Sequence, residues 1–503
     1  MKLLILRRTL LSTIAVALAA PAAAAAAGPV GMVEEIPMHA NVGGIAAGPE
    51  GNLWFTLNTP FGKNTRNAAG RITPDGRVTM FRKGLTAGVE PSEIVAGADG
   101  NLWFTFDGGI TAAGGGGVAR ITPRGKIAEF FEPPELHGVP FELVLGPDGN
   151  IWFDHAAILT PTGQAIGRIT PNGEIAEFSA GVAETAAVTH PVAGPDGNVW
   201  FADNSDHPAI GRITPGGEIT SFPLPPREFP ILEGPSPGPD GRLWFSVNEP
   251  TPAVERISSG GSIERFTSGL GGRVEDVGPF VAGPDGKVWF GIDKRPPHSS
   301  PDTERGLTGI GRITVGGKIA EFSHCLRPMP WYSAPDSLIT GPDGNVWFAT
   351  QPSGEDSNPM RSSIPSIGRV TPAGRITEFR LGLHERSEPE ALTASGGSIW
   401  FIDRETDSIG RIRPPHRPPN TFLVLSARRL GGRIRVRVAV PGPGRLRLRL
   451  PGGGAVEHRA PDCGTTTIAV PHRAAATAGG PRRDSLTFTP RGGSSYTRSI
   501  ALP

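Results

Sequence analysis

A Trp-Phe pair recurs eight times along the chain, and consecutive copies are 44 to 58 residues apart. Most copies follow a Gly-Pro-Asp-Gly turn, and the stretch GPDGNVWF occurs twice letter for letter, at 194–201 and 341–348. A repeat of this length is typical of β-propellers, in which each unit is a four-stranded blade. The tryptophans are Trp54, Trp103, Trp152, Trp200, Trp244, Trp289, Trp347 and Trp400.

Two further motifs keep the same period. GRITPDG at 70–76 returns with small changes in every repeat, and VTMF at 78–81 returns as IAEF, ITSF, IERF or ITEF. Each repeat therefore contains four strand-like segments, A to D, in which B carries Trp-Phe, C carries Gly-Arg-Ile-Thr and D ends in Phe. The glycines of the intervening turns supply the positive φ that tight hairpins need. We interpret the tryptophans as packing between blades and the repeated arginine as a structural ion pair or a cap.

The number of D segments predicts how the ring closes. Eight A–B–C sets are present, but only seven D segments follow them, since the chain runs from Ile412 into RPPHRPPN. The segment VEEIPM at 33–38 has the D pattern and precedes the first A segment. We therefore predict an all-β fold: an eight-bladed propeller closed by an N-terminal strand, which leaves no open sheet edge. Seven blades with a stray repeat is the alternative.

Composition divides the chain into four parts: a signal peptide at 1–27, the propeller at 28–412, a Pro-rich linker at 413–420 and an Arg-rich β-sandwich at 421–503. The first part has a basic start, a short apolar run and small residues near its end, as export signals do. Its Arg7-Arg8 pair resembles a twin-arginine signal, and a plain secretory signal is the other reading. The protein is expected to be extracellular or associated with the cell wall, and no later segment is apolar enough to span a membrane.

Residues 413–503 contain 16 Arg and only three acidic residues. RIRVRV at 433–438 and RLRLRL at 445–450 alternate strictly, which predicts a hairpin with one apolar face and one face of six arginines. So many like charges favour a partner that is anionic, either a cell-envelope polymer or the acidic propeller itself. Export disfavours nucleic acid as that partner. Cys325 and Cys463 are the chain's two cysteines, so their pairing stays open and a zinc site built on cysteine is excluded.

The unit GPDGNLWFT…IGRITPDGKITEF resembles that of the streptogramin B (virginiamycin B) lyases, and the resemblance covers about 33–412. It implies a propeller that opens a cyclic depsipeptide antibiotic at its ester bond by elimination. In that family a histidine removes the proton next to the ester carbonyl, and magnesium held partly by glutamates polarises the carbonyl. Those lyases usually have seven blades, so an eighth repeat is a departure.

Carried over position by position, the resemblance implies that Glu388 keeps a metal role and that Glu405 is the second metal ligand, unless Arg404 occupies that position. Glu390 stands where the family has its base histidine, and Asp336 stands where it has a partner histidine. The implied catalytic residues are therefore Glu390 and Asp336, with Mg²⁺ as the implied cofactor. Burial and crowding could raise the pKa of such a carboxylate enough for it to act as a base.

Two functions follow from these observations. The first is a divalent-cation-dependent carbon–oxygen lyase acting on cyclic depsipeptides or lactones. The second is a non-catalytic binding propeller, whose variable B–C and D–A loops would hold a peptide or glycan while the basic domain anchors it to the envelope. In either case we expect a monomer. Two histidines are noted: His155, at the start of a B–C loop, is a candidate ligand, and His190 lies near an inner strand.

Overall fold

The computed structural model describes residues 29–502 apart from a set of internal segments. The segments left out are 60–66, 109–115, 133–138, 157–164, 183–187, 206, 226–231, 249–250, 272–273, 295–304, 308, 324–327, 331–334, 336, 351–364, 385, 431–432, 451–453, 462 and 472–483. The expected signal peptide at 1–27, Asp336 and Cys325 lie outside the described residues.

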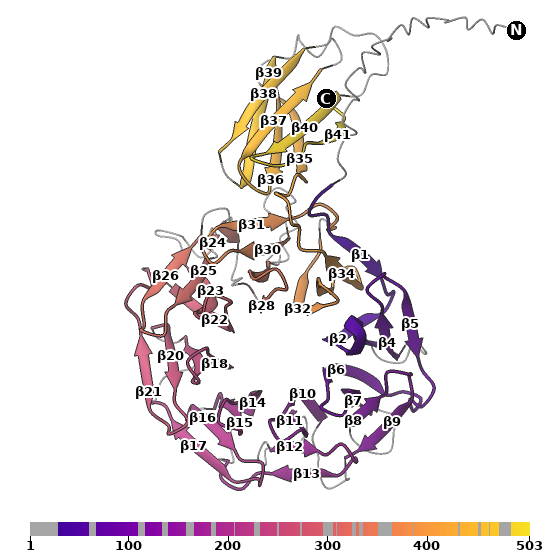
Figure 1. Ribbon diagram of the computed structural model, residues 1–503, viewed down its shortest axis with the longest axis vertical. Helices are drawn as coiled ribbons and strands as arrows, with labels where there is room; N and C mark the ends of the chain where they lie inside the picture. Colours follow the sequence, from indigo (N-terminus) through magenta and orange to yellow (C-terminus); the bar gives the residue numbers. More distant parts are fainter. Residues whose placement is uncertain are drawn as a thin grey trace, which may run out of the picture.

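The described part of the chain is all-β, with one short 3₁₀ turn at Pro49–Gly51 (η1), and the described strands from 34 to 412 form eight four-stranded antiparallel sheets around a common centre (Figure 1). The inner A strands are β2 (Asn41–Ala47), β6 (Glu90–Ala96), β10 (Val139–Leu145), β14 (Val188–Ala193), β18 (Leu232–Pro237), β22 (Val274–Ala282), β28 (Leu338–Thr340) and β32 (Pro389–Ser395). The B strands are β3 (Leu53–Asn58), β7 (Leu102–Asp107), β11 (Ile151–Ala156), β15 (Val199–Asp203), β19 (Leu243–Val247), β23 (Val288–Lys294), β29 (Val346–Thr350) and β33 (Ser398–Asp403).

The two outer strands of each sheet complete this arrangement. The C strands are β4 (Ala68–Ile72), β8 (Gly117–Ile121), β12 (Ile166–Ile169), β16 (Ala209–Ile213), β20 (Ala253–Ile257), β25 (Gly309–Ile313), β30 (Ser366–Val370) and β34 (Ser408–Ile412). The D strands are β5 (Val78–Phe81), β9 (Ile127–Phe131), β13 (Ile175–Phe178), β17 (Ile219–Pro223), β21 (Ile263–Phe266), β26 (Ile319–Phe322), β31 (Ile376–Phe379) and β1 (Glu34–Pro37). A small pair, β24 (Arg305–Leu307) with β27 (Pro328–Pro330), stands apart from them.

The core lies within and between the sheets, and the repeated tryptophans are its largest members. All eight tryptophans of the repeat are at most 1% exposed. In seven sheets the indole stacks on the Phe of the same sheet's D strand, as Trp54 does on Phe81 with ring centroids 5.6 Å apart. Burying an aromatic side chain of this size contributes about 2–3 kcal/mol, so the Trp-Phe motif is the packing element of each repeat.

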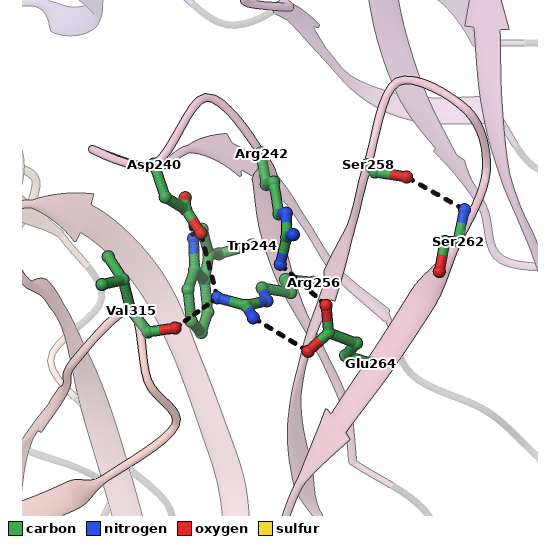
Figure 2. Close-up of polar contacts among 8 residues, drawn as sticks. All are labelled: Asp240, Arg242, Trp244, Arg256, Ser258, Ser262, Glu264 and Val315. Carbon is green, nitrogen blue, oxygen red and sulfur yellow. Dashed lines mark hydrogen bonds and ion pairs between the residues drawn. The ribbon is translucent and has the colours of Figure 1, made fainter.

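The arginine of each C strand ties its sheet to the next one. Figure 2 shows Arg256, which donates to the Asp240 carboxylate (3.0 Å), to Glu264 (2.8 Å) and to the carbonyl of Val315 in the following sheet (2.6 Å). Its guanidinium also lies over the Trp244 ring, 5.2 Å from the centroid. Asp240 accepts from the Trp244 indole as well (3.0 Å), so one network joins the A–B turn, the core and the neighbouring sheet.

The N-terminal strand completes the last sheet. β1 pairs antiparallel with β34, and Glu34 lies opposite Arg411, which is the pairing that the count of D segments predicts. Arg411 donates from Nε to Glu34 (3.1 Å) and from Nη1 to the carbonyl of Pro74 in the first sheet (3.0 Å). Each A strand contacts the next around the ring, and β32 contacts β2. The first and last repeats are therefore held together by main-chain pairing and by one arginine.

The C-terminal strands form two further antiparallel sheets. One holds β35 (Leu423–Leu430), β36 (Arg433–Val440) and β39 (Gly464–Pro471), and the other holds β38 (Ala455–Ala460), β37 (Gly444–Arg449), β40 (Asp484–Pro490) and β41 (Tyr496–Ile500). Their inward side chains make one core, in which Val436 and Ile468 of the first sheet share a cluster with Leu448 and Phe488 of the second.

The predicted arginine hairpin is wrong. β36 pairs with β35 and β39, whereas β37 pairs with β38 and β40, so the two Arg-rich strands belong to different sheets. The alternation itself is as expected, because the leucines, valines and isoleucine point into the shared core and the arginines are exposed. The six arginines are therefore divided between two outer faces, since the turn between the strands carries the chain from one sheet to the other.

The junction between the two parts of the chain is ordered by polar contacts. The Asn420 side chain is fully buried and accepts from the Val30 amide (2.7 Å), while Thr421 donates to the Gly31 carbonyl (3.3 Å). Cys463 takes part in a disulfide. No helix among the described residues is long and apolar enough to cross a membrane.

Candidate functional site

The A strands share an irregularity close to the centre of the ring. In β6, β10, β14 and β32 the register with the B strand shifts at the same place in the repeat, leaving two residues unpaired. One unpaired position of each strand, two residues before the residue that pairs with the tryptophan, holds Glu93, Glu142, His190 and Ala391. His190 and Ala391 have positive φ values of 55° and 48° there. Such bulges turn side chains away from the regular alternation and are frequent beside functional sites.

Glu142 is held between two neighbours at this level of the ring. Its backbone N–H donates to Asp154 Oδ1 (2.7 Å), and its own carboxylate accepts from the His190 backbone N–H (2.6 Å). The His190 imidazole is 3.9 Å from the same carboxylate and its side chain is 44% exposed. The inner edges of β10 and β14 thus present a carboxylate and an imidazole side by side to solvent.

Two carboxyl groups here have raised pKa values. Burial, together with the charge of Glu142, raises the pKa of Glu93 to about 7; Glu390 and Asp154 add to the effect and Arg404 opposes it. Burial likewise raises the pKa of Asp154 to about 7, despite the hydrogen bond from the Glu142 N–H. Glu93 belongs to the second sheet, Glu142 and Asp154 belong to the third, and Glu390 belongs to the last. Their electrostatic coupling therefore exists only in the closed ring. A carboxyl that titrates near neutral pH is suited to accept a proton at that pH.

Glu390 lies in β32 beside these groups. Its side chain is 20% exposed and forms an ion pair with Arg404, which is half-exposed at the end of β33. Burial raises the pKa of Glu390 against the opposing effect of Arg404, and the charges of Glu388 and Asp403 contribute. The backbone N–H of Glu388 donates to Asp403 Oδ1 (2.9 Å), which holds the start of β32 against the end of β33.

The other residues implied by the family resemblance are Glu388, Glu405 and Asp336. Glu405 is exposed, and its carboxylate pairs with Arg386. Asp336 lies outside the described residues; next to it, Ser337 accepts from the Leu392 N–H (2.9 Å). Among the described residues, neither Glu388 nor Glu405 belongs to a group of three side chains placed to share a metal ion. The metal roles implied for Glu388 and Glu405 stay predictions.

One group of described residues does have the arrangement that a metal ion needs. Glu132, His155 and Glu177 offer ligand atoms that all lie within 4.8 Å of one another, so the group could hold a metal ion; Glu132 and His155 are buried and Glu177 is partly exposed. Although burial disfavours the imidazolium, the neighbouring Glu132 and Glu177 raise the pKa of His155. This group lies between the second and third sheets along the chain, on strands that sequence reasoning did not connect, although His155 itself was noted as a candidate ligand.

Sequence reasoning missed Glu93, Glu142 and Asp154. The signal was available, because Glu93 and Glu142 occupy the repeat position of His190, two residues before the apolar pair that ends strand A. The resemblance instead directed attention to the last two repeats.

A model of the Virginiamycin B lyase family matches residues 31–353, which is more than half of the chain. The chain belongs to that family. In this member the match ends before the last repeat, so Glu388, Glu390 and Glu405 lie beyond the matched region, whereas Glu93, Glu142 and Asp154 lie within it.

Similar solved structures include those of a lyase and a hydrolase. One is a catalytically inactive virginiamycin B lyase from Staphylococcus aureus with quinupristin, at 25% identity and a TM-score of 0.45, covering 76% of this chain and 99% of that one. Another is a puromycin hydrolase mutant complexed with PGG, at 13% identity and a TM-score of 0.44, covering 75% of this chain and 61% of that one. A search of curated proteins found no match.

Proposed function

We propose that the eight four-stranded sheets are the blades of an eight-bladed propeller closed by β1, and that the two C-terminal sheets are a small β-sandwich. The closed ring of A strands and the pairing of β1 with β34 support the first part. The shared core of the C-terminal sheets supports the second. On this arrangement the B–C and D–A connections open on one face of the ring, so a ligand would enter at the centre of that face.

We further propose that this centre carries out an elimination that opens an ester in a cyclic depsipeptide or lactone. The observation that carries the proposal is the Glu93 carboxyl, whose pKa of about 7 suits a general base at neutral pH. Membership of the Virginiamycin B lyase family supports the reaction class. Glu93 would take the role that the family resemblance gives to a histidine.

In the proposed step, ionised Glu93 removes a proton from the carbon next to a carbonyl group. The electron pair of that C–H bond forms a carbon–carbon double bond, and the adjacent carbon–oxygen bond of the ester breaks to release a carboxylate. Arg404 stabilises the negative charge that develops on oxygen, since its guanidinium is half-exposed and reaches the same group of carboxylates. Glu390 holds Arg404 in place.

The test is turnover of a panel of cyclic depsipeptides and lactones, followed by mass spectrometry. Elimination leaves the mass of the product equal to that of the substrate, whereas hydrolysis adds one water. Glu93→Gln should lower kcat by at least about 100-fold, because it removes the base without changing its size. In the unaltered protein kcat/KM should rise through one ionisation near pH 7.

Glu174→Gln is the matched control, since this exposed glutamate lies in a C–D turn of the opposite face. It should leave turnover unchanged. A Glu93→Gln protein that opens the ring at the normal rate would contradict the proposal, and so would a product heavier by one water.

A second candidate function rests on the exposed arginines. Arg433, Arg435 and Arg437 project from one outer face of the C-terminal part, and Arg445, Arg447 and Arg449 project from the other. We propose as the alternative a binding propeller held to an anionic cell-envelope polymer. Retention on isolated cell walls should then weaken with salt. Replacing one arginine triplet by Gln and then the other would show which face binds, and unchanged retention with both replaced would exclude this function.

Export to an oxidising compartment fits both candidates. The disulfide at Cys463 supports it, because disulfides persist in such compartments. Fractionation of cells that express the full chain, with and without Arg7→Lys and Arg8→Lys, would test the compartment and the route.

A further inference from the structure

His155 occupies a position that is apolar in four of the eight repeats and polar in the other four. It is the second residue after Trp-Phe in β11, and it pairs across to Pro140 in β10. The same position in four other sheets holds Leu57, Phe106, Val247 and Ile292, each at most 1% exposed. His155 is itself only 3% exposed, so the chain buries an imidazole where other repeats bury a hydrocarbon. A buried polar group of this kind needs a compensating interaction.

Two carboxylates provide that interaction, one from each of two neighbouring sheets. Glu132 Oε1 is 2.6 Å from His155 Nε2, and Glu177 Oε1 is 3.2 Å from the same nitrogen. Glu132 directly follows β9 in the second sheet, whereas His155 and Glu177 belong to β11 and β13 of the third (Figure 1). The Glu132 side chain is fully buried and that of Glu177 is 21% exposed. Three ligand atoms therefore meet at a point that only Glu177 connects with solvent.

The group is incompletely satisfied as it stands. Glu132 Oε2 is buried and has no hydrogen-bond partner among the described residues, although its carboxylate lies against the imidazole. Two carboxylates and one imidazole can share a single proton, but one proton leaves a buried oxygen without a donor. A divalent cation placed among the three groups would neutralise both carboxylates and supply the missing contact.

We propose that Glu132, His155 and Glu177 form a binding site for a divalent transition metal of the zinc class, which joins the second sheet of the ring to the third. An imidazole nitrogen with two carboxylate oxygens favours Zn²⁺ over Mg²⁺ and Ca²⁺, which take oxygen ligands. The site is separate from the proposed base, because Glu93 and Glu390 are not among its ligands. Its role is to fix β11 against the second sheet. Asp154, which accepts a hydrogen bond from the Glu142 N–H, directly precedes His155 in that strand.

The experiment is titration of the full-length, chelator-treated protein with ZnCl₂ alone by isothermal calorimetry, followed by Co²⁺ substitution and visible absorption. The unaltered protein should bind Zn²⁺ at one site that excess Mg²⁺ does not occupy, and the Co²⁺ form should show d–d bands. Two substitutions, His155→Phe and Glu177→Gln, should each weaken Zn²⁺ binding by at least about 100-fold. Loss of a residue that only hydrogen-bonds to a metal ligand already weakens metal binding by about 10- to 100-fold, and loss of the ligand itself should cost no less. The phenylalanine at 155 is the side chain that Phe106 has at the same position of the second sheet.

His190→Gln and Glu388→Gln are the controls. His190 is an exposed histidine and Glu388 is the metal ligand implied by the family resemblance, so both variants should keep this Zn²⁺ site. X-ray absorption of the Zn²⁺-loaded unaltered protein should show one imidazole in the first coordination shell, which decides the matter even if His155→Phe does not fold. Absence of Zn²⁺ binding in the unaltered protein, binding that survives in Glu177→Gln, or a shell without imidazole would each overturn the proposal.

Discussion

At the scale of single residues, the repeat motifs are explained by one recurring network. The Asp of the A–B turn accepts from the tryptophan indole in six of the sheets, and the C-strand arginine covers the ring and donates to a carbonyl of the next sheet. These carbonyls belong to Pro123, Pro171, Pro215, Ser259, Val315, Pro372 and Pro74. Motif and period are thus conserved within the chain because each copy builds one interface.

Arg369 is the exception that the closure of the ring explains. In the other sheets the C-strand arginine donates to a carbonyl in the C–D turn of the next sheet. The sheet after Arg369 has β34 as its C strand and β1, from the start of the chain, as its D strand, so no turn joins them and no such carbonyl is present. The Arg369 guanidinium donates to Asp343 instead (3.2 Å) and keeps its place over Trp347.

Arg256→Met should lower the free energy of unfolding by about 3 kcal/mol, because it removes the donor to Asp240 Oδ2 and to the Val315 carbonyl at a buried side chain. Arg242→Met is the matched control: Arg242 pairs with Glu264 in solvent, and its loss should cost less than about 1 kcal/mol. Denaturant unfolding followed by tryptophan fluorescence measures both. Equal effects of the two substitutions would contradict the role given to the network.

At the scale of elements, the most consequential strand is β1. It lies at the start of the described chain yet completes the sheet made by the last repeat, so the ring is closed by pairing between its two ends. Val33, just before β1, is 1% exposed and belongs to the core cluster that contains Phe379 and Phe401. Its backbone N–H also donates to the Leu381 carbonyl (2.8 Å).

Val33→Asp should therefore destabilise the protein by about 3–5 kcal/mol, since it places a charge in that cluster. Met32→Asp, one residue earlier and 45% exposed, should have little effect. Hydrogen exchange should show the β34 amides losing protection first in the Val33 variant. Protection lost equally in all eight sheets would argue against β1 as the closing element.

At the scale of the whole molecule, pH acts on the centre of the ring. The pKa values of Glu93 and Asp154 are raised to about 7 in the folded protein, above the values near 4 that such groups have when exposed. The folded state thus binds these protons more tightly than the unfolded state does. Their contribution to stability is complete below about pH 4 and is lost as the pH rises through about 7.

Glu93→Gln removes one of these titrations. Near pH 4 the variant and the unaltered protein should be equally stable, whereas at pH 8 the variant should be more stable by on the order of 2 kcal/mol, because it no longer holds a buried charge among other carboxylates. Denaturant midpoints measured from pH 4 to 8 give the difference. A difference that does not change with pH would show that Glu93 does not titrate in this range.

The sequence by itself determined the repeats, the four strands in each, the identity of the missing D strand and the alternation in the arginine-rich strands. These features follow from local patterns, since Trp-Phe, Gly-Arg-Ile-Thr and the turn glycines act within one repeat and can be counted. Only the tertiary structure decided that Glu93, Glu142, Asp154 and Glu390 meet at the centre, that β36 and β37 lie in different sheets, and that Glu132 reaches His155. Such contacts depend on burial and on distances between residues far apart in the chain, and a raised pKa or a set of metal ligands exists only once those distances are closed.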